Sequence, residues 1–409
     1  MLIGNAIVGQ SGGPTAAINA TLAGVIRGAK ESSEIKTIFG AFNGVEGMLA
    51  GHFTDLTELT EDDLKLLETT PAAALGSCRR KLPPPAEQSS EPVYEQLLDF
   101  FKANEIRYFF YIGGNDSMDT VAKLSEWISG KNYEMRVIGV PKTIDNDVIG
   151  TDHTPGYGSA AKFIATSIQE ILRDTAVYTV KAVTIVEIMG RDAGWLTAAA
   201  ALPRRICGVS PDLVYLPERA FSYEQFYADL DAAFATHPNV VVAVSEGLRF
   251  SNGKYVGEDD QSGAFDVFGH RYLSGTGRTL EMAVKDMFGC KVRSVELNLL
   301  QRCASHIASA TDLEESVRVG KASVSAAIAG ETAKMMCFER VSGSDYQLRI
   351  FPGDIKKIAN RIRRVPDEFI SAEGNNITDA GIDYLLPLIQ GEPKIAFENG
   401  LPKHFVFKR

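Results

Sequence analysis

The sequence contains few cysteines, and they show no pattern of pairing. Five occur in 409 residues, at positions 78, 207, 290, 303 and 337, and no two of them form a CxxC motif. An odd number of scattered cysteines argues against a disulfide framework or a zinc site. We therefore expect a protein of a reducing compartment, the cytoplasm.

Long apolar runs and an excess of positive charge are also absent. No apolar run approaches the roughly 20 residues needed to span a bilayer, and no apolar leader precedes the first predicted strand. The formal net charge is −10, which argues against general affinity for nucleic acid or for an anionic membrane. We expect neither of these partners, although a local cationic pocket can still hold an anionic small molecule.

What remains is the composition of an ordinary globular enzyme. Apolar residues make up 45% and charged residues 23% of the chain, and a length of 409 residues allows one to three domains. Short β-prone apolar segments alternate with helical segments, which predicts an α/β fold with parallel sheets. The predicted strands are 2–8, 108–112, 137–140, 178–188, 239–244 and 292–300, and residues 249–270 are predicted to form a surface flap.

The most informative stretch runs from Ile112 to Asp147. It contains two polar loops, 113–117 and 141–147, and each follows a predicted buried strand. Loops at the carboxyl ends of parallel strands are where open α/β folds bind their ligands. The three Asp and one Lys in these loops are hard to explain by turn formation alone.

Asp145 is the residue best suited to catalysis. Asp145 and Asp147 alternate with Asn146, so both carboxylates would point the same way in an extended stretch. One can then accept a proton from a substrate hydroxyl while the other helps to hold a metal ion. Phosphoryl transfer depends chiefly on in-line positioning and on neutralising charge as it spreads. A turn with solvated carboxylates would explain residues 143–147 in isolation, but not their place beside Lys142.

Two further charged residues lie in the same loops. The ammonium of Lys142 is a compact charge that can meet the charge of a leaving phosphate, although most lysines are simply solvated. Asp116 puts a negative charge into what otherwise looks like a phosphate-binding loop. Asn115, Asp116 and Ser117 are each suited to cap the helix predicted to follow.

A glycine loop follows the first predicted strand. In the run Gly9-Gln10-Ser11-Gly12-Gly13 a strand passes into a helix, an arrangement that turns backbone N–H groups toward a phosphate. The alternatives are a plain tight turn and the G-x-S-x-G elbow of a serine hydrolase with Ser11 as nucleophile. The elbow needs an upstream loop for its oxyanion hole, which the eight residues before Gly9 do not offer.

Several residues in other loops are candidates for binding phosphate or sugar oxygens. Arg79 follows a Gly-Ser turn and is a candidate to bind phosphate. A solvated basic face would explain Arg79 and its basic neighbours at 80 and 81 about as well as a phosphate-binding arm would. Arg191 and Glu246 follow the ends of two predicted strands, where a guanidinium can grip oxygens and a carboxylate can bind sugar hydroxyls. Arg293 and Arg302 lie at opposite ends of the last predicted strand, and we expect at least one to bind a distal phosphate.

Taken together, these motifs resemble those of the phosphofructokinase family over nearly the whole chain. The resemblance is carried by Ser11-Gly12-Gly13, Gly76-Ser77-Cys78-Arg79, residues 113–117, residues 143–147, Met189-Gly190-Arg191, Glu246 and Gln301-Arg302. It implies two three-layer α/β domains with the active site in the cleft between them, plus an appended C-terminal segment. We expect a phosphoryl-donor domain at 1–157 completed by roughly 303–350, a fructose-6-phosphate domain at 158–302, and the appended segment at 351–409.

The resemblance also implies roles for individual residues. Asp145 matches the base that deprotonates the 1-hydroxyl of fructose 6-phosphate, and Arg293 matches an arginine supplied by a neighbouring subunit. The residues matching the sugar-phosphate site are Thr143, Ile144, Met189, Gly190, Arg191, Glu246 and Arg302. Those matching the phosphoryl-donor site, which includes Mg²⁺, are Gly12, Gly13, Arg79, Gly114 and Ser117. We expect a glycolytic homo-oligomer, a dimer or a tetramer.

Two positions predict the phosphoryl donor. Family members that use ATP carry glycine where this chain has Asp116 and Lys142, and members that use pyrophosphate carry Asp and Lys there. A carboxylate would crowd and repel the α-phosphate of a nucleotide, whereas an ammonium can stabilise a bare phosphate leaving group. The resemblance therefore implies reversible phosphoryl transfer from diphosphate to fructose 6-phosphate. In that reaction Asp116 and Lys142 join Asp145 as catalytic residues, and the products are fructose 1,6-bisphosphate and phosphate.

Three positions depart from the family pattern. Asn115 stands where the family places a metal-binding Asp and offers only a neutral oxygen, so Asp116, Asp145 and Asp147 are open as residues for the metal to lean on, and we expect Asn115 and Asp147 as its ligands. Leu299 stands where many relatives place His or Tyr in the sugar-phosphate site, and Ala182 stands where a neighbour's arginine often falls. Two alternatives stay open: an ATP-dependent phosphofructokinase, and an inactive family member that binds sugar phosphates without turnover.

Overall fold

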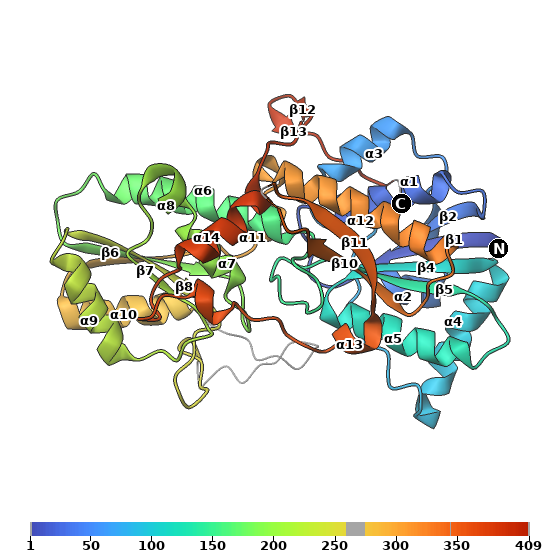
Figure 1. Ribbon diagram of the computed structural model, residues 1–409, viewed down its shortest axis with the longest axis horizontal. Coiled ribbons are helices and arrows are strands. Elements are labelled where there is room, and N and C mark those ends of the chain that lie inside the picture. The colour runs from blue at the N-terminus through green and yellow to red at the C-terminus, as the bar shows by residue number, and fades with distance from the viewer. Residues whose placement is uncertain (1, 259–274, 344, 408–409) are drawn as a thin grey trace.

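Two sheets, each covered by helices on both faces, form two lobes that lie side by side in the computed structural model (Figure 1). The structure describes residues 2–258, 275–343 and 345–407. Part of the predicted surface flap, residues 259–270, lies outside these ranges. No helix in the described part of the chain is long and apolar enough to cross a membrane.

The larger sheet has the strand order β11-β10-β5-β4-β1-β2-β3. Its inner strands run parallel, and the edge strands β11 and β3 pair antiparallel with their neighbours. The register pairs Gly113 with Pro141, so β4 and β5 end together and their two polar loops leave the same edge of the sheet. The strands are β1 (Gly4–Gln10), β2 (Ile35–Ala41), β3 (Phe53–Asp55), β4 (Ile106–Gly113), β5 (Arg136–Pro141), β10 (Lys334–Arg340) and β11 (Leu348–Asp354).

Helices cover both faces of this sheet because its central strands are apolar on both sides. On one face lie α1 (Ile18–Lys30), α3 (Glu61–Glu68) and α12 (Ala310–Ile328), and on the other lie α2 (Gly44–Ala50), α4 (Glu91–Ala103), α5 (Asn115–Ser129) and the single turn α13 (Ile355–Ile358) (Figure 1). Glycines allow α1 and α12 to pack closely: a Cβ on Gly24 would lie 2.2 Å from the carbonyl oxygen of Val317.

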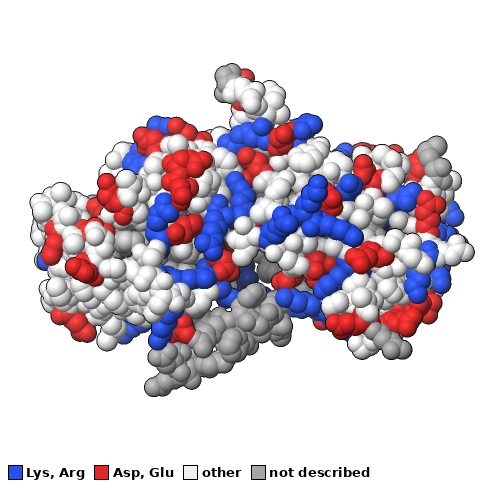
Figure 2. All heavy atoms as spheres, turned by 60° about the horizontal axis from the view of Figure 1, so that its bottom comes forward, with Lys and Arg blue, Asp and Glu red and all other residues white. Residues whose placement is uncertain are grey.

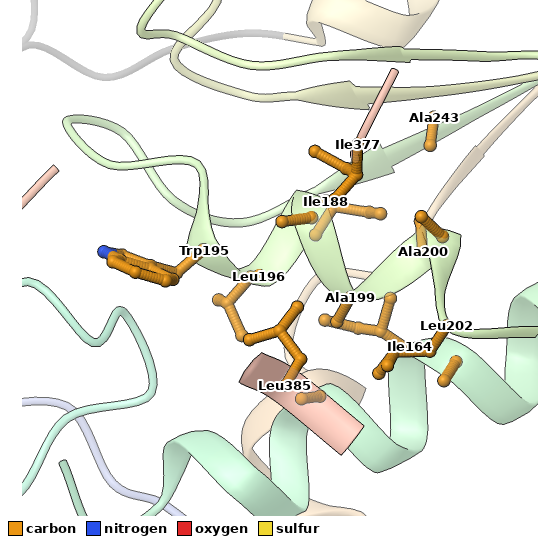
Figure 3. Packing of buried hydrophobic residues seen from close by; sticks show 14 of the residues in the cluster. Ile164, Ile188, Trp195, Leu196, Ala199, Ala200, Leu202, Ala243, Ile377 and Leu385 are labelled. Carbon is orange, nitrogen blue, oxygen red and sulfur yellow. The ribbon is translucent and has the colours of Figure 1, made fainter. Parts of the chain in front are cut away.

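The smaller sheet has the order β7-β8-β6-β9, and all its strands run parallel. Its strands are β6 (Ala182–Ile188), β7 (Leu213–Tyr215), β8 (Asn239–Ser245) and β9 (Lys291–Glu296). The helices of this lobe are α6 (Tyr157–Thr175), α7 (Trp195–Ala198), α8 (Pro203–Cys207), α9 (Tyr223–Phe234), α10 (Thr276–Phe288), α11 (Leu300–Cys303) and α14 (Asp379–Leu385). The alanines at 198–201 let the segment after Trp195 pack closely on this sheet (Figure 3).

Shorter elements complete the chain. They are 3₁₀ turns at Gln88–Ser90, Ala199–Ala201, Ser305–Ile307, Asp367–Phe369 and Leu386–Ile389, and a small hairpin of β12 (Phe397–Glu398) and β13 (Leu401–Pro402). The predicted fold class, two helix-covered α/β units with an added C-terminal segment, is confirmed. The predicted domain boundaries stay a prediction, and the one between residues 350 and 351 falls inside β11.

Two predictions about the ends of helices and strands were wrong. Helix α5 is capped by Gly114 without a side-chain hydrogen bond, so the polar residues at 115–117 lie in its first turn and are free to face the cleft. Strand β9 ends at Glu296, which places Arg293 within the strand and Arg302 in α11, not at its two ends. Ile355, Ile358, Ala359 and Ile362 have the spacing of an apolar helical stripe, but only Ile355–Ile358 form a helical turn.

Candidate active site

A cleft of about 500 Å³ lies between the lobes, and the loops that follow β1, β4, β5, β6 and β8 open into it. Lys and Arg side chains gather where the two lobes meet (Figure 2). Most of the residues predicted from the sequence line this cleft: Gly12, Gly13, Arg79, Gly114, Asn115, Asp116, Ser117, Lys142, Thr143, Ile144, Asp145, Asp147, Met189, Arg191, Glu246 and Arg302.

Lys142 is buried in the cleft floor against the glycine loop. The residue is 2% exposed, and its ammonium donates a hydrogen bond of 2.5 Å to the carbonyl oxygen of Gly13. A Cβ on Gly12, which has φ +77°, would lie 3.3 Å from Nζ of the lysine, so glycine makes this approach possible. Burial lowers the pKa of Lys142 to about 7, and Asp145 opposes this shift by stabilising the charged ammonium.

The two carboxylates reach the cleft, but not through the extended conformation predicted from their alternation. Asn146 between them has φ +53°, in the left-handed region, and is fully buried. Its Oδ1 accepts a hydrogen bond of 3.1 Å from the backbone N–H of Thr154. The asparagine therefore anchors the loop to the segment that leads into α6 of the smaller lobe, while Asp145 and Asp147 remain at the cleft surface.

Burial raises the pKa of both carboxyl groups. For Asp145, the positive charges of Lys142 and Arg191 oppose the rise. For Asp147 the pKa reaches about 7, because repulsion from Asp145 adds to the cost of burial. Each carboxylate is thus held where the approach of positive charge is strongly favourable.

The residues present fit a hard cation beside Asp147. Nδ2 of Asn115 donates to Oδ2 of Asp147 over 3.4 Å, and Oδ1 of Asn115 is buried with no hydrogen-bond partner. A buried carbonyl oxygen without a partner is costly, and a cation coordinated by oxygen would satisfy it. Within the described ranges no cluster of three or more His, Cys, Asp or Glu offers a metal site. A metal site beside Asp147 would therefore need the amide oxygen of Asn115 as a ligand.

The turn after β6 is held in place by one group that follows β8 and one on α11. The backbone N–H of Gly190 donates to Oε1 of Glu246 over 3.1 Å, and that of Met189 donates to Oε1 of Gln301 over 3.1 Å. Gly190 has φ +120°, a conformation that favours glycine. These bonds present Arg191 and Glu246 to the cleft from the smaller lobe. Burial raises the pKa of Glu246, with a further contribution from Asp145.

Arg302 brings positive charge from α11 to the glycine loop. Its Nη1 would lie 3.4 Å from a Cβ on Gly13. Burial and the nearby charge of Arg79 both lower the pKa of Arg302, so the two guanidinium groups repel each other across the cleft. Such an arrangement is stable when an anion lies between them. Asp116 is 41% exposed at the edge of the same site and forms an ion pair of 3.0 Å with Lys81.

Comparison with known proteins follows this geometry. A family model described as Phosphofructokinase matches residues 5–327. The chain belongs to the phosphofructokinase family. This family member is 41% identical to the pyrophosphate–fructose 6-phosphate 1-phosphotransferase of Xanthomonas campestris pv. campestris, over 100% of this chain and 97% of that one. It is 40% identical to the protein of that name from Halomonas elongata, over 98% and 95% of the two chains.

Solved structures agree with this grouping. The structure of a pyrophosphate-dependent phosphofructokinase from Nitrosospira multiformis superposes with a TM-score of 0.87 and 37% identity, covering 98% of this chain and 95% of that one. Because both lobes are included, the likeness extends to the relative placement of the two sheets around the cleft.

Two sequence interpretations need a partner group that this cleft does not supply within the described residues. Arg293 lies on the exposed edge strand β9, outside the cleft lining, so its contact with substrate requires a second copy of the chain and stays a prediction. The hydroxyl of Ser11 donates to the carbonyl oxygen of Cys78 over 3.0 Å, and among the described residues no histidine lines the cleft. In the described cleft, Ser11 therefore has no histidine base that could activate it as the nucleophile of a serine hydrolase.

The structure also adds cleft residues that the sequence patterns did not indicate. Asp192 follows Arg191 and faces the same cavity, and it pairs with Arg249. Asn360 and Ile362 line the cleft from the C-terminal segment. No local motif marks these two residues, because only the tertiary fold brings the C-terminal segment beside the cleft.

Proposed function

We propose that this protein transfers a phosphoryl group reversibly between diphosphate and the 1-hydroxyl of fructose 6-phosphate. The products in the forward direction are fructose 1,6-bisphosphate and phosphate. The observation that carries the proposal is the buried ammonium of Lys142, which lies against the glycine loop and is electrostatically coupled to Asp145. The names of relatives that match nearly the full chain support the same reaction.

The residues of the cleft divide into an acceptor side and a donor side. On the acceptor side, Arg191, Glu246 and Arg302 bind the sugar phosphate, and the carboxylate of Asp145 takes the proton of the 1-hydroxyl as it attacks. On the donor side, the backbone of the glycine loop, Arg79 and the first turn of α5 hold diphosphate. Lys142 meets the charge that develops on the departing phosphate, which is the main task of a protein in phosphoryl transfer.

Mg²⁺ belongs to this proposal as the metal that Asn115 and Asp147 would hold. The buried Oδ1 of Asn115 and the raised pKa of Asp147 support this assignment. When bound, the ion supplies positive charge to the diphosphate oxygens. We also propose that the chain works in the cytoplasm as a homo-oligomer, a dimer or a tetramer, in which Arg293 of one copy reaches the sugar phosphate bound by another.

One coupled assay tests the reaction and the two alternatives. Fructose 1,6-bisphosphate formation is measured with fructose 6-phosphate and Mg²⁺, supplying either diphosphate or ATP as donor. Turnover with diphosphate and little with ATP is the expected result. Preferred use of ATP would assign the chain to the ATP-dependent alternative. Binding of fructose 6-phosphate without turnover on either donor would identify an inactive family member.

The lowered pKa of Lys142 predicts the alkaline side of the pH profile. Its ammonium is charged below a pKa of about 7 and neutral above it, so kcat/KM for diphosphate should fall as the pH rises above about 7. Diphosphate also titrates in this range, and Lys142→Arg serves as the control because arginine stays charged. The fall should be steeper in the wild type than in this variant. Parallel profiles would show that Lys142 does not set the alkaline limb.

A further inference from the structure

The segment from residue 359 to residue 365, here called the C-terminal strap, crosses from the larger lobe to the smaller lobe beside the cleft (Figure 1). It follows α13 and lies beyond the residues matched by the family model. At its start, Nδ2 of Asn360 donates to Oδ1 of Asp119 on α5 over 3.0 Å. At its end, the N–H of Val365 donates to Oε1 of Glu218 in the smaller lobe over 2.9 Å.

The middle of the strap is bonded to the loop that carries both cleft carboxylates. The backbone N–H of Arg363 donates to the carbonyl oxygen of Asp147 over 2.7 Å. Ile362 pairs with Val148 in an antiparallel bridge. Because Asp145 precedes Asp147 by only two residues, the strap restrains the backbone of the proposed catalytic base.

Arg363 also bonds to the smaller lobe, through Trp195. The indole Nε1 donates to the carbonyl oxygen of Arg363 over 3.1 Å, and the guanidinium lies 4.1 Å from the centre of the indole ring. Trp195 is fully buried, and its nitrogen points away from the aliphatic side chains of the core (Figure 3). It begins α7, immediately after the turn that presents Arg191. Glu218 strengthens this junction, because its Oε1 also accepts the N–H of Gly194 over 2.9 Å.

A third contact leads from Arg363 to the segment that connects β5 of the larger lobe with α6 of the smaller lobe. Its Nη2 donates to the hydroxyl of Tyr384 over 3.0 Å, and that hydroxyl donates to the carbonyl oxygen of Asp152 over 2.7 Å. One residue is thereby bonded to the loop of the base, to the turn of the sugar-binding residues and, through Tyr384, to the connection between the lobes.

We propose that Arg363 is a positioning residue that sets the spacing of Asp145 from Arg191 and Glu246 across the cleft. This inference depends on the proposed function, in which the base and the sugar-binding groups act on one substrate. Arg363 itself touches neither the proposed reacting atoms nor the cleft surface. Its effect is geometric: if the contacts of its guanidinium with Trp195 and Tyr384 are lost, the two lobes can shift relative to each other while each site remains intact.

Arg363→Met tests the proposal, because methionine keeps the backbone bonds and much of the side-chain volume but removes the guanidinium. A misplacement well below 1 Å is expected to lower kcat by roughly 10-fold, while KM for diphosphate and for fructose 6-phosphate changes by less than about 3-fold. Arg363→Lys, which restores a cation over the indole, should recover part of the loss. Arg361→Met is the matched control, because Arg361 is exposed on the same strap and should leave kcat unchanged.

Tryptophan fluorescence gives a readout that does not require turnover. The chain has two tryptophans, so Trp127→Phe leaves Trp195 as the only indole. In that background, binding of fructose 6-phosphate should change the Trp195 emission when Arg363 is present. The change should be lost or reduced at least about 3-fold in Arg363→Met. The fluorescence test still applies to a protein without turnover on diphosphate, so failure of the proposed function is distinguishable from failure of the strap proposal.

Two kinetic results would overturn the role of Arg363. One is a kcat for Arg363→Met within twofold of the wild type. The other is a fall in kcat that matches a fall in the folded fraction measured by circular dichroism, since a purely structural role predicts fewer active molecules with unchanged kinetics. An emission change on sugar-phosphate binding that survives in Arg363→Met would likewise show that the strap does not couple Trp195 to the site.

Discussion

Replacement of Asp145 by Asn is expected to lower kcat by about 10²–10⁴-fold, the usual contribution of a positioned general base. The amide has nearly the same shape as the carboxylate but cannot accept the proton of the 1-hydroxyl. Burial raises the pKa of Asp145, which makes its carboxylate a stronger base than a solvated one. Binding of fructose 6-phosphate, measured by calorimetry, should change little, because Arg191 and Glu246 stay in place.

The matched control is Asp99→Asn on the exposed side of α4, which makes the same chemical change away from the cleft. This variant should keep wild-type kcat. If Asp145→Asn retained near-normal turnover, the base would have to be another group, and Asp147 would be the next candidate. If instead the variant lost sugar-phosphate binding, Asp145 would be a binding residue and the assignment of its role would be wrong.

The second large effect is expected at the two donor positions. Changing Lys142 to Gly should lower kcat/KM for diphosphate by about 10²–10³-fold, as does loss of a preorganised group that meets developing charge. Adding Asp116→Gly removes a carboxylate from the position that repels a nucleotide. The double variant should therefore use ATP better than the wild type. The gain is expected to be about 10-fold, because the ion pair with Lys81 already offsets part of the negative charge at Asp116.

Single variants separate the two roles in the same coupled assay. Lys142→Gly alone should lose activity with diphosphate and gain none with ATP, whereas Asp116→Gly alone should gain some use of ATP. Asp119→Gly, one turn along α5 from Asp116, is not a suitable control because it contacts the strap. Asp99→Gly on α4 makes the same chemical change outside the cleft. A wild-type protein that already prefers ATP would contradict the assignment of both donor residues.

Much of the architecture was predictable because it follows from local patterns. The β4 strand contains a continuous apolar run, residues 108–112, buried on both faces, which identifies a central parallel strand without further information. The loops after β4 and β5 had to meet, because parallel neighbours end at the same edge of a sheet. Asp116, in the loop after β4, was therefore expected in one site with Lys142 and Asp145, which both lie in the loop after β5.

Other features were not predictable from local patterns. Asn146 departs from the extended conformation because its buried side chain accepts a hydrogen bond from the backbone of Thr154, in the segment between β5 and α6. Gly114 caps α5 in place of the polar residues that follow it. In both cases a tertiary contact or a nearby backbone decides the conformation, and propensity alone favours a different one.

Local sequence patterns are enough to establish the fold class, the edges of the sheets that carry the site, and the chemical groups available there, because strand periodicity and loop composition are local properties. How those groups are held follows from contacts between distant segments. Burial lowers the pKa of Lys142, and the strap places Arg363 between Asp147 and Trp195. Both depend on segments far apart in the chain, whose contacts arise only in the folded protein and leave no periodic signal in the sequence.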